Sequence, residues 1–72
     1  MKIDIKFGLK GIFGQSLIKR DIKEPNITID EDNIVNISYY IERKGTKRYY
    51  EYKIPYSQLA YTGIRRTLEN GD

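Results

Sequence analysis

Apolar and polar residues alternate in two neighbouring stretches, 34–43 and 48–54, which are separated by Lys44, Gly45, Thr46 and Lys47. A period of two is typical of strands with one buried face, and a glycine between two such runs favours a β-hairpin. With Gly45 and Thr46 at the tip, the same face is predicted to carry three cross-strand pairs: Ile37 with Ile54, Tyr39 with Tyr52, and Ile41 with Tyr50.

A third strand is expected immediately before this hairpin. Ile27 and Ile29 alternate with polar residues, and Glu31-Asp32-Asn33 forms a plausible three-residue turn with Asn33 in the left-handed conformation. This turn would place Ile29 opposite Val35 and Ile27 opposite Ile37, on the face already assigned as buried. The two turns therefore agree on a three-stranded meander over 27–54.

The N-terminal third is less regular. Ile3, Ile5 and Phe7 alternate with charged residues and predict a half-buried strand. Glycines then interrupt 8–14, which we interpret as a bend because the run has neither P-loop nor dinucleotide-binding spacing. Residues 16–22 are predicted to form a second strand, with a short helix as the alternative.

After Pro55 the apolar period changes to that of a helix. The spacing predicts a helix over 57–69 whose stripe comprises Tyr56, Leu59, Ala60, Gly63, Ile64, Thr67 and Leu68. The predicted fold is thus α+β: one domain, 1–72, with a mainly antiparallel sheet of three to four strands and one C-terminal helix packed on one face. The predicted core comprises Ile3, Ile5, Ile27, Ile29, Val35, Ile37, Tyr39, Ile41, Tyr50, Tyr52, Ile54, Leu59, Ala60, Ile64 and Leu68.

Composition narrows the possible chemistry. The 72 residues include no cysteine and no histidine, which removes thiolate ligands, the commonest zinc ligand and the commonest general base. The acidic turn Asp30-Glu31-Asp32-Asn33 lacks the spacing of a calcium-binding loop. We expect a protein that is not an enzyme and that uses no cofactor and no metal.

Charge distribution and amino-acid usage indicate where the basic residues lie and what kind of organism or element the protein comes from. The net charge is +3, but 25–42 holds four acidic and no basic residues, so the basic residues lie in the two flanking segments. Twelve isoleucines against one alanine and one valine indicate AT-rich codons, as in a phage or mobile element of a low-GC bacterium. No apolar run approaches the ~20 residues of a membrane span, and we expect a cytoplasmic protein with no membrane contact.

The hairpin tip carries the candidate site. Four cations at the tip (Arg43, Lys44, Lys47 and Arg48) could contact phosphates, and Tyr40 and Tyr49, expected on the outer face, could stack on bases. Arg43 and Arg48 are predicted cross-strand neighbours, a pairing of like charges that favours a bound anion. A solvated turn is the alternative for the cations. Ordinary strand chemistry or a protein interface is the alternative for the tyrosines, because Glu51 is expected opposite Tyr40 and Glu42 opposite Tyr49.

These patterns lead to two functional hypotheses. The first is a small nucleic-acid-binding accessory protein of a phage or mobile element. The second is an inhibitor or adaptor module that binds a host protein through its tyrosine-rich sheet face or edge, and a structural subunit of a larger assembly is a third interpretation. A thin core and an exposed aromatic side predict a homodimer in either case. Tyr61, Arg65 and Arg66, on the outer side of the predicted helix, are further candidate contacts.

Overall fold

The computed structural model describes residues 1–11 and 14–68 and is built almost entirely of β-strands. One 3₁₀ turn, η1 (Tyr56–Gln58), is its only helical element within those residues. The strands are β1 (Lys2–Leu9), β2 (Ser16–Lys19), β3 (Lys23–Ile29), β4 (Ile34–Arg43), β5 (Thr46–Pro55) and β6 (Leu59–Thr67).

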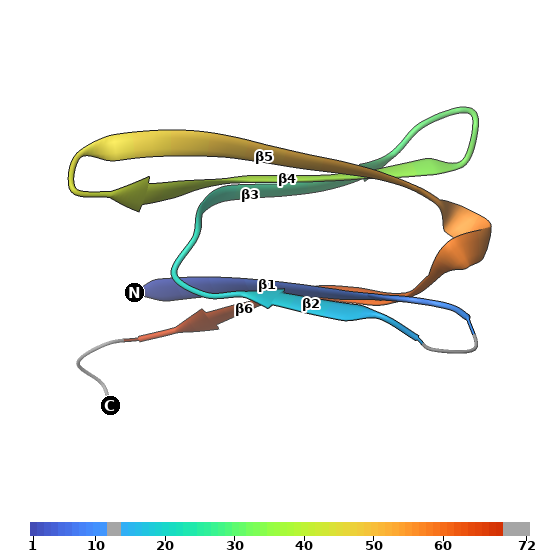
Figure 1. Ribbon diagram of the computed structural model, residues 1–72, viewed down its shortest axis with the longest axis horizontal. Coiled ribbons are helices and arrows are strands. Elements are labelled where there is room, and N and C mark those ends of the chain that lie inside the picture. Colours follow the sequence, from blue (N-terminus) through green and yellow to red (C-terminus); the bar gives the residue numbers. More distant parts are fainter. Residues whose placement is uncertain (12–13, 69–72) are drawn as a thin grey trace.

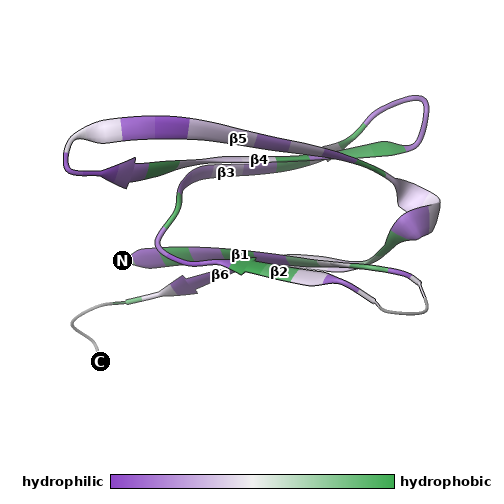
Figure 2. Ribbon diagram, viewed as in Figure 1, coloured by the Kyte–Doolittle hydropathy of each residue, from purple (hydrophilic) through white to green (hydrophobic). Residues whose placement is uncertain are grey.

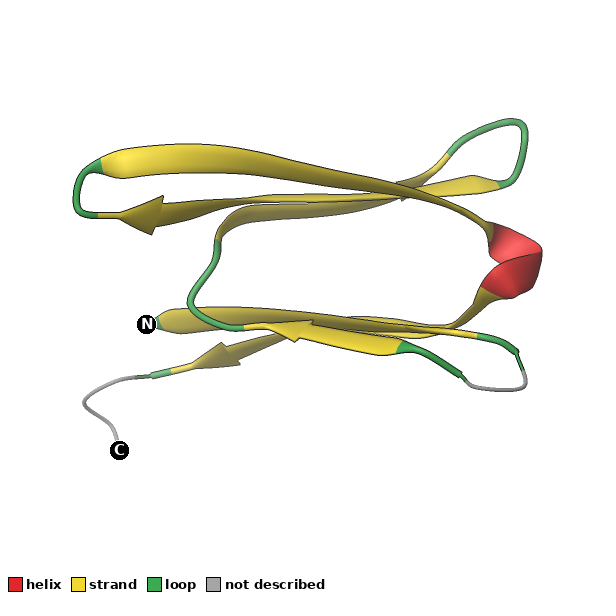
Figure 3. Cartoon of the chain, in the orientation of Figure 1, coloured by secondary structure: helices red, strands yellow, loops and turns green. Residues whose placement is uncertain are grey.

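The strands form two antiparallel sheets with the orders β2-β1-β6 and β3-β4-β5. Figures 1 and 3 show the two sheets stacked as layers, joined at one end by the segment between β2 and β3 and at the other by η1. The prediction of one sheet covered by a C-terminal helix is therefore wrong. The chain is a small β-sandwich in which each sheet covers the inner face of the other.

The predicted helix over 57–69 is wrong, because residues 57 and 58 lie in η1 and residues 59–67 form β6, while residue 69 lies outside the described residues. β6 pairs antiparallel with β1 from Lys2–Thr67 to Leu9–Leu59. Threonine, tyrosine and isoleucine favour strands, and Gly63 would cost about 1 kcal/mol in a helix. Pairing with β1 also satisfies the backbone groups of an edge that a helix would leave open, so a contact between distant segments overrides the local helical period.

The central hairpin keeps the predicted faces but not the predicted register. Its inner pairs are Val35–Ile54, Ile37–Tyr52 and Tyr39–Tyr50. The tip is Lys44-Gly45, and both residues have positive φ angles, 50° and 80°, as a two-residue type I′ turn requires. Each residue of β4 therefore pairs with a residue of β5 two positions earlier than predicted, and a shift of two leaves every side chain on the same face.

The register shift changes the neighbours of the charged residues. Arg43 lies opposite Thr46 and Arg48 lies opposite Ile41, so the predicted direct pairing of the two arginines is wrong. Glu51 lies opposite Ser38, and Glu42 lies opposite Lys47. As a result, neither carboxylate is directly opposite a tyrosine, and Tyr40 and Tyr49 face each other instead.

The turn between β3 and β4 confirms its prediction. Ile27 pairs with Ile37 and Ile29 with Val35, and Asn33 has a left-handed φ of 59°. The Asp30 carboxylate accepts hydrogen bonds from the backbone amides of Asp32 (2.9 Å) and Ile34 (3.0 Å). This local turn chemistry fixes the register without help from the rest of the chain.

The core lies between the two sheets. Its buried residues are Ile5, Phe7, Ile22, Val35, Ile37, Tyr39 and Ile54. Ile29, Ala60 and Leu68 were predicted in the core but are exposed, whereas Phe7 and Ile22 are buried and were not predicted. Ile22 lies on the segment that crosses between the sheets, and its amide donates to the carbonyl of Ile3 (2.8 Å).

Candidate nucleic-acid interface

The β4–β5 hairpin projects beyond the β2-β1-β6 sheet, which is the lower of the two layers in Figure 1 and is called the lower sheet below. The β3-β4-β5 sheet is called the upper sheet. Figure 1 shows the hairpin turn at the end of the molecule that also holds the N-terminus, reaching past the start of β1. The long axis of the molecule measures 38 Å. The projecting end carries the four cations predicted as phosphate contacts, and Figure 2 shows hydrophilic residues concentrated there. Among the described residues, no strand of the β2-β1-β6 sheet covers this end, so its inner side is exposed.

That inner side forms an open hollow of about 490 Å³. Its lining residues are Ile41, Arg43, Lys44, Thr46, Arg48 and Tyr50, none of them acidic. Arg43 and Arg48 lie diagonally across the two strands, a separation that long side chains can bridge. Arg43 donates to the backbone carbonyl of Glu42 (3.3 Å), and no carboxylate among the described residues forms an ion pair with either arginine. Three cations therefore share a hollow that a bound anion would neutralise.

The outer side of the same hairpin is balanced in charge. The Tyr40 and Tyr49 rings contact each other with centroids 5.1 Å apart, and the Lys47 ammonium lies 4.6 Å from the Tyr40 centroid. Lys47 also forms an ion pair with Glu24 (2.7 Å), which raises the pKa of the lysine. The Tyr49 hydroxyl donates to Glu51 (2.8 Å), and this bond raises the pKa of Tyr49.

The six predicted site residues are thus divided between two sides of the hairpin. Arg43, Lys44 and Arg48 line the inner hollow, whereas Lys47 lies with Tyr40 and Tyr49 on the outer face. The acidic turn of residues 30–32 is at the opposite end of the molecule, as Figure 1 shows. The acidic turn therefore lies far from the basic hairpin in space, and of the acidic residues in 25–42 only Glu42 lies on the hairpin, opposite Lys47.

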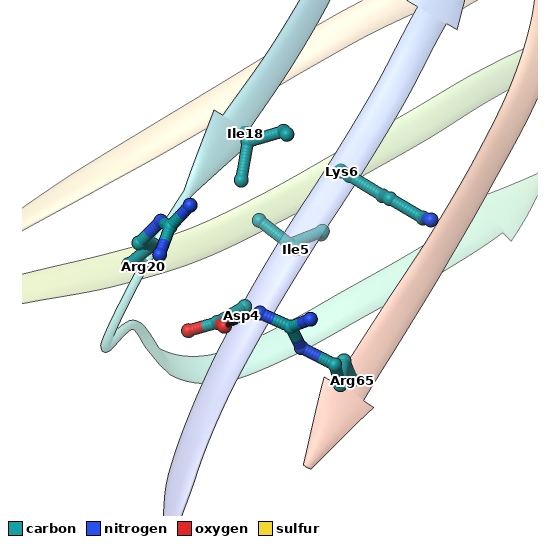
Figure 4. A pocket seen from close by; sticks show the side chains of 6 residues that line it. All are labelled: Asp4, Ile5, Lys6, Ile18, Arg20 and Arg65. Carbon is teal, nitrogen blue, oxygen red and sulfur yellow. Dashed lines mark hydrogen bonds and ion pairs between the residues drawn. The ribbon is translucent and has the colours of Figure 1, made fainter. Parts of the chain in front are cut away.

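A second group of cations, on the outer face of the β2-β1-β6 sheet, was not part of the predicted site. Asp4 lies at its centre, between Arg20 and Arg65, with Lys6 and Ile18 nearby (Figure 4). Sequence reasoning had noted Arg65, but on a helix, and had no means of bringing it beside Lys6. The alternation of charged and apolar residues in β1 was the one local signal, because it predicts that Asp4 and Lys6 share the outer face.

The Asp4 carboxylate is held by specific partners. Arg65 Nη2 donates to Asp4 Oδ2 (2.8 Å), and the Asp21 amide donates to Oδ1 (3.1 Å). The bond from Arg65, followed by that from the Asp21 amide, lowers the pKa of Asp4 below its ordinary value. Since this carboxylate is already paired, it offsets Arg65 but leaves Lys6 and Arg20 without an ion pair among the described residues.

Within residues 1–11 and 14–68, no group of three or more acidic, histidine or cysteine side chains is placed to hold a metal ion. Over that range, too, no helix has the length and apolar character needed to cross a bilayer. Comparisons with protein-family models, curated proteins and solved structures found no match to this chain.

Proposed function

We propose that this protein is a small, non-enzymatic nucleic-acid-binding protein, an accessory protein of a phage or mobile element, and that its basic hairpin contacts the phosphate backbone. The observation that carries this proposal is the hollow formed by Arg43, Lys44 and Arg48, which has no acidic residue in its lining. Clustered guanidinium groups match phosphate geometry because each can donate two parallel hydrogen bonds.

The shape and charge of the hairpin support this assignment. Ile41 and Tyr50 form the apolar part of the hollow, so they reduce the hydration of the neighbouring cations and strengthen their attraction to an anion. The acidic turn at the far end gives the molecule a basic and an acidic pole. A polyanion approaching such a molecule is steered toward the basic pole.

A second candidate function is a protein-binding inhibitor or adaptor, and the Tyr40–Tyr49 pair favours it. Tyr49 is 52% exposed, and the charges around the pair are already matched by Glu24 and Glu51. A neutral aromatic patch on an open sheet is typical of a protein interface. Binding through this patch would change little with salt, whereas binding through the hairpin cations would weaken steeply.

The deciding experiment is a fluorescence-anisotropy titration of the full chain with a labelled oligonucleotide at several salt concentrations. The wild type should bind at ~50 mM salt and weaken as salt rises. The Arg43→Ala/Arg48→Ala variant should bind more weakly. The slope of the logarithm of its binding constant against the logarithm of the salt concentration should be smaller in magnitude by about 1.4, because each phosphate contact on a single strand contributes about 0.7 and the variant loses two.

Lys53→Ala is the control. Lys53 is an exposed cation of β5, the strand that also carries Arg48, but it lies on the outer face, where its Nζ is 3.9 Å from Oε1 of Glu51. This variant should leave the salt slope unchanged. The proposal fails if the wild type binds no oligonucleotide at ~50 mM salt, where electrostatic association is strong. It also fails if the control loses as much affinity as the double variant. The predicted homodimer is tested separately by the mass of the protein in solution.

A further inference from the structure

We propose that the outer face of the β2-β1-β6 sheet is a platform for single-stranded nucleic acid, on which a base stacks against Tyr61 and phosphates meet Lys6 and Arg20. This inference rests on the proposed function and adds the class of nucleic acid and a second contact surface. None of these three residues belongs to the hairpin hollow.

The strand register arranges the outer face in rows. Residues that point outward from β1 alternate with the buried Ile5 and Phe7, and their partners on β2 and β6 point to the same side. Successive rows lie about 6.7 Å apart, which is two residues of an antiparallel strand. From one end to the other, the rows are Ser16–Gly8–Tyr61, Ile18–Lys6–Gly63 and Asp4–Arg65, and Arg20, which follows β2, lines the same pocket as Asp4.

Two glycines on this face provide space for the side chains beside them. A Cβ atom on Gly8 would lie 2.7 Å from Cζ of Tyr61, so the tyrosine ring rests directly over the Gly8 backbone. A Cβ on Gly63 would lie 4.0 Å from Cε of Lys6, whose chain extends toward β6 (Figure 4). Tyr61 is 47% exposed, so its ring packs on the sheet while part of the ring remains accessible to a ligand.

The charge of the face suits a polyanion. Among the residues of the three strands, Lys2, Lys6 and Arg65 point outward with one acidic residue, Asp4, which is already bound by Arg65. Arg20, which follows β2, lines the same pocket as Lys6 and Arg65. A shallow pocket of about 150 Å³ lies between Lys6, Arg20 and Arg65. Ile18, 53% exposed, adds apolar surface at its edge. Cations interleaved with an exposed aromatic ring and apolar surface are the combination by which proteins hold unpaired nucleotides.

Stacking on Tyr61 requires an unpaired base and therefore a single strand. A base in a duplex is already stacked between its neighbours, so its face is not available to a side chain. The inner side of the projecting hairpin and the outer face of the lower sheet also point in the same direction, because the two layers are stacked (Figure 1). A flexible strand could therefore contact the hairpin hollow and continue along the platform.

The test compares a single-stranded oligothymidine with a duplex of equal length in the anisotropy assay. Tyr61→Ala should weaken single-strand binding by about 5- to 150-fold, the range for loss of one stacked base. Duplex binding should change by less than about twofold, because no base of a duplex stacks on the ring. Tyr61→Phe keeps the ring and should bind as the wild type does. Lys6→Ala/Arg20→Ala should weaken binding and lower the salt slope by about 1.4.

The outcomes separate this inference from the proposed function. If the wild type binds the oligonucleotide and Arg43→Ala/Arg48→Ala weakens it, but Tyr61→Ala and Lys6→Ala/Arg20→Ala bind normally, the platform is disproved and the hairpin function is retained. Equal losses for the single strand and the duplex in Tyr61→Ala would also disprove it. A lowered thermal midpoint of Tyr61→Ala would mean that this change also destabilises the fold. In that case the affinity of the Lys6→Ala/Arg20→Ala variant decides whether the platform binds, because Lys6 and Arg20 are exposed and their removal should leave the fold intact.

Discussion

The outer faces of the two sheets both present tyrosines and cations, yet they differ in how those groups are paired. On the β3-β4-β5 face, Lys47 is bound by Glu24, and Glu51 accepts from Tyr49 and lies near Lys53. On the β2-β1-β6 face, the one carboxylate, Asp4, is taken by Arg65, and Lys6 and Arg20 have no ion pair among the described residues.

Residue types alone therefore do not determine how strongly a sheet face attracts a phosphate, because the pairing of its charges differs. A cation beside a carboxylate attracts a phosphate less strongly, because the neighbouring negative charge repels the phosphate. A cation without a partner contributes its full attraction and releases counterions when it binds. The inner faces, by contrast, are alike, because residues of both sheets form one buried core.

The shared core gives the prediction of largest effect. Ile5, from the lower sheet, and Ile37, from the upper sheet, are both fully buried. Replacing either with alanine should lower the free energy of unfolding by about 2–5 kcal/mol, because each change leaves a cavity between the same two layers. Urea unfolding followed by circular dichroism measures this. A variant of one sheet that leaves the transition unchanged would show that the core is not shared.

Charge reversal tests the difference between the outer faces directly. At ~50 mM salt, Lys6→Glu/Arg20→Glu should reduce single-strand affinity by at least about 100-fold, because the change replaces two attractions with two repulsions. Lys47→Glu/Lys53→Glu alters the net charge equally but should cost no more than about tenfold, and this loss should shrink toward 150 mM salt, where the Debye length is about 8 Å. Equal losses at both salt concentrations would contradict the comparison.

The two glycines of the lower face allow a finer test. Gly8→Ala should displace the Tyr61 ring and weaken single-strand binding by about 5-fold or more, as loss of one stacked base does. Gly63→Ala is the matched control, since its Cβ would meet only Lys6 Cε, at 4.0 Å, an ordinary contact. Affinity measurements on both variants decide the matter. If Gly8→Ala binds normally, the position of the ring is irrelevant to binding.

The buried tyrosine of the upper sheet yields a smaller effect. The Tyr39 side chain is fully buried, and its hydroxyl has no hydrogen-bond partner within the described residues. Burial raises the pKa of this hydroxyl above its ordinary value. Removing an unsatisfied buried group should leave stability unchanged or raise it by about 1 kcal/mol, so Tyr39→Phe should unfold at the same or a higher urea concentration than the wild type. A clear loss of stability would indicate that the hydroxyl does have a partner.

The smallest predicted effect concerns Asp4 and pH. Its pKa is lowered in the folded state, chiefly by the bond from Arg65, so its contribution to stability is present above the unfolded value of 3.8 and is lost as the pH falls through the folded value. The stability difference between the wild type and Asp4→Asn should therefore shrink between about pH 5 and pH 2. Urea unfolding at several pH values measures the difference. A gap that stays constant with pH would exclude a role for the Asp4 charge.

The parts of the fold that sequence patterns predicted correctly depend on local interactions. The alternation in β4 and β5 fixes which side chains face inward, and a register error of two residues does not alter the faces. The turn at Asp30–Asn33 is fixed by its own side chains. The C-terminal segment was mispredicted because the stripe Leu59, Ala60, Gly63 and Ile64 fits a helical period, while its actual pairing with β1 joins residues about sixty positions apart.

The difference between local and distant contacts also explains which site residues could be predicted from the sequence. The residues of the hairpin are neighbours in the sequence, so their separation into an inner and an outer group follows from the register. The lower face combines both ends of the chain, where Lys6 adjoins Gly63 and Asp4 adjoins Arg65. No local period brings these residues together. Only the sheet order places Tyr61 over Gly8 and beside the cations.

The most direct test of the functional account is an NMR titration that follows backbone amide shifts as single-stranded oligothymidine is added to the wild-type protein. The account predicts that shifts concentrate at residues 41–48 and on the outer positions of β1, β2 and β6, including Lys6 and Tyr61. The acidic turn at 30–32 and the Glu51–Lys53 segment should remain unchanged. Shifts confined to the acidic turn or to 51–53, or no shifts at ~50 mM salt, where phosphate contacts are strong, would contradict it.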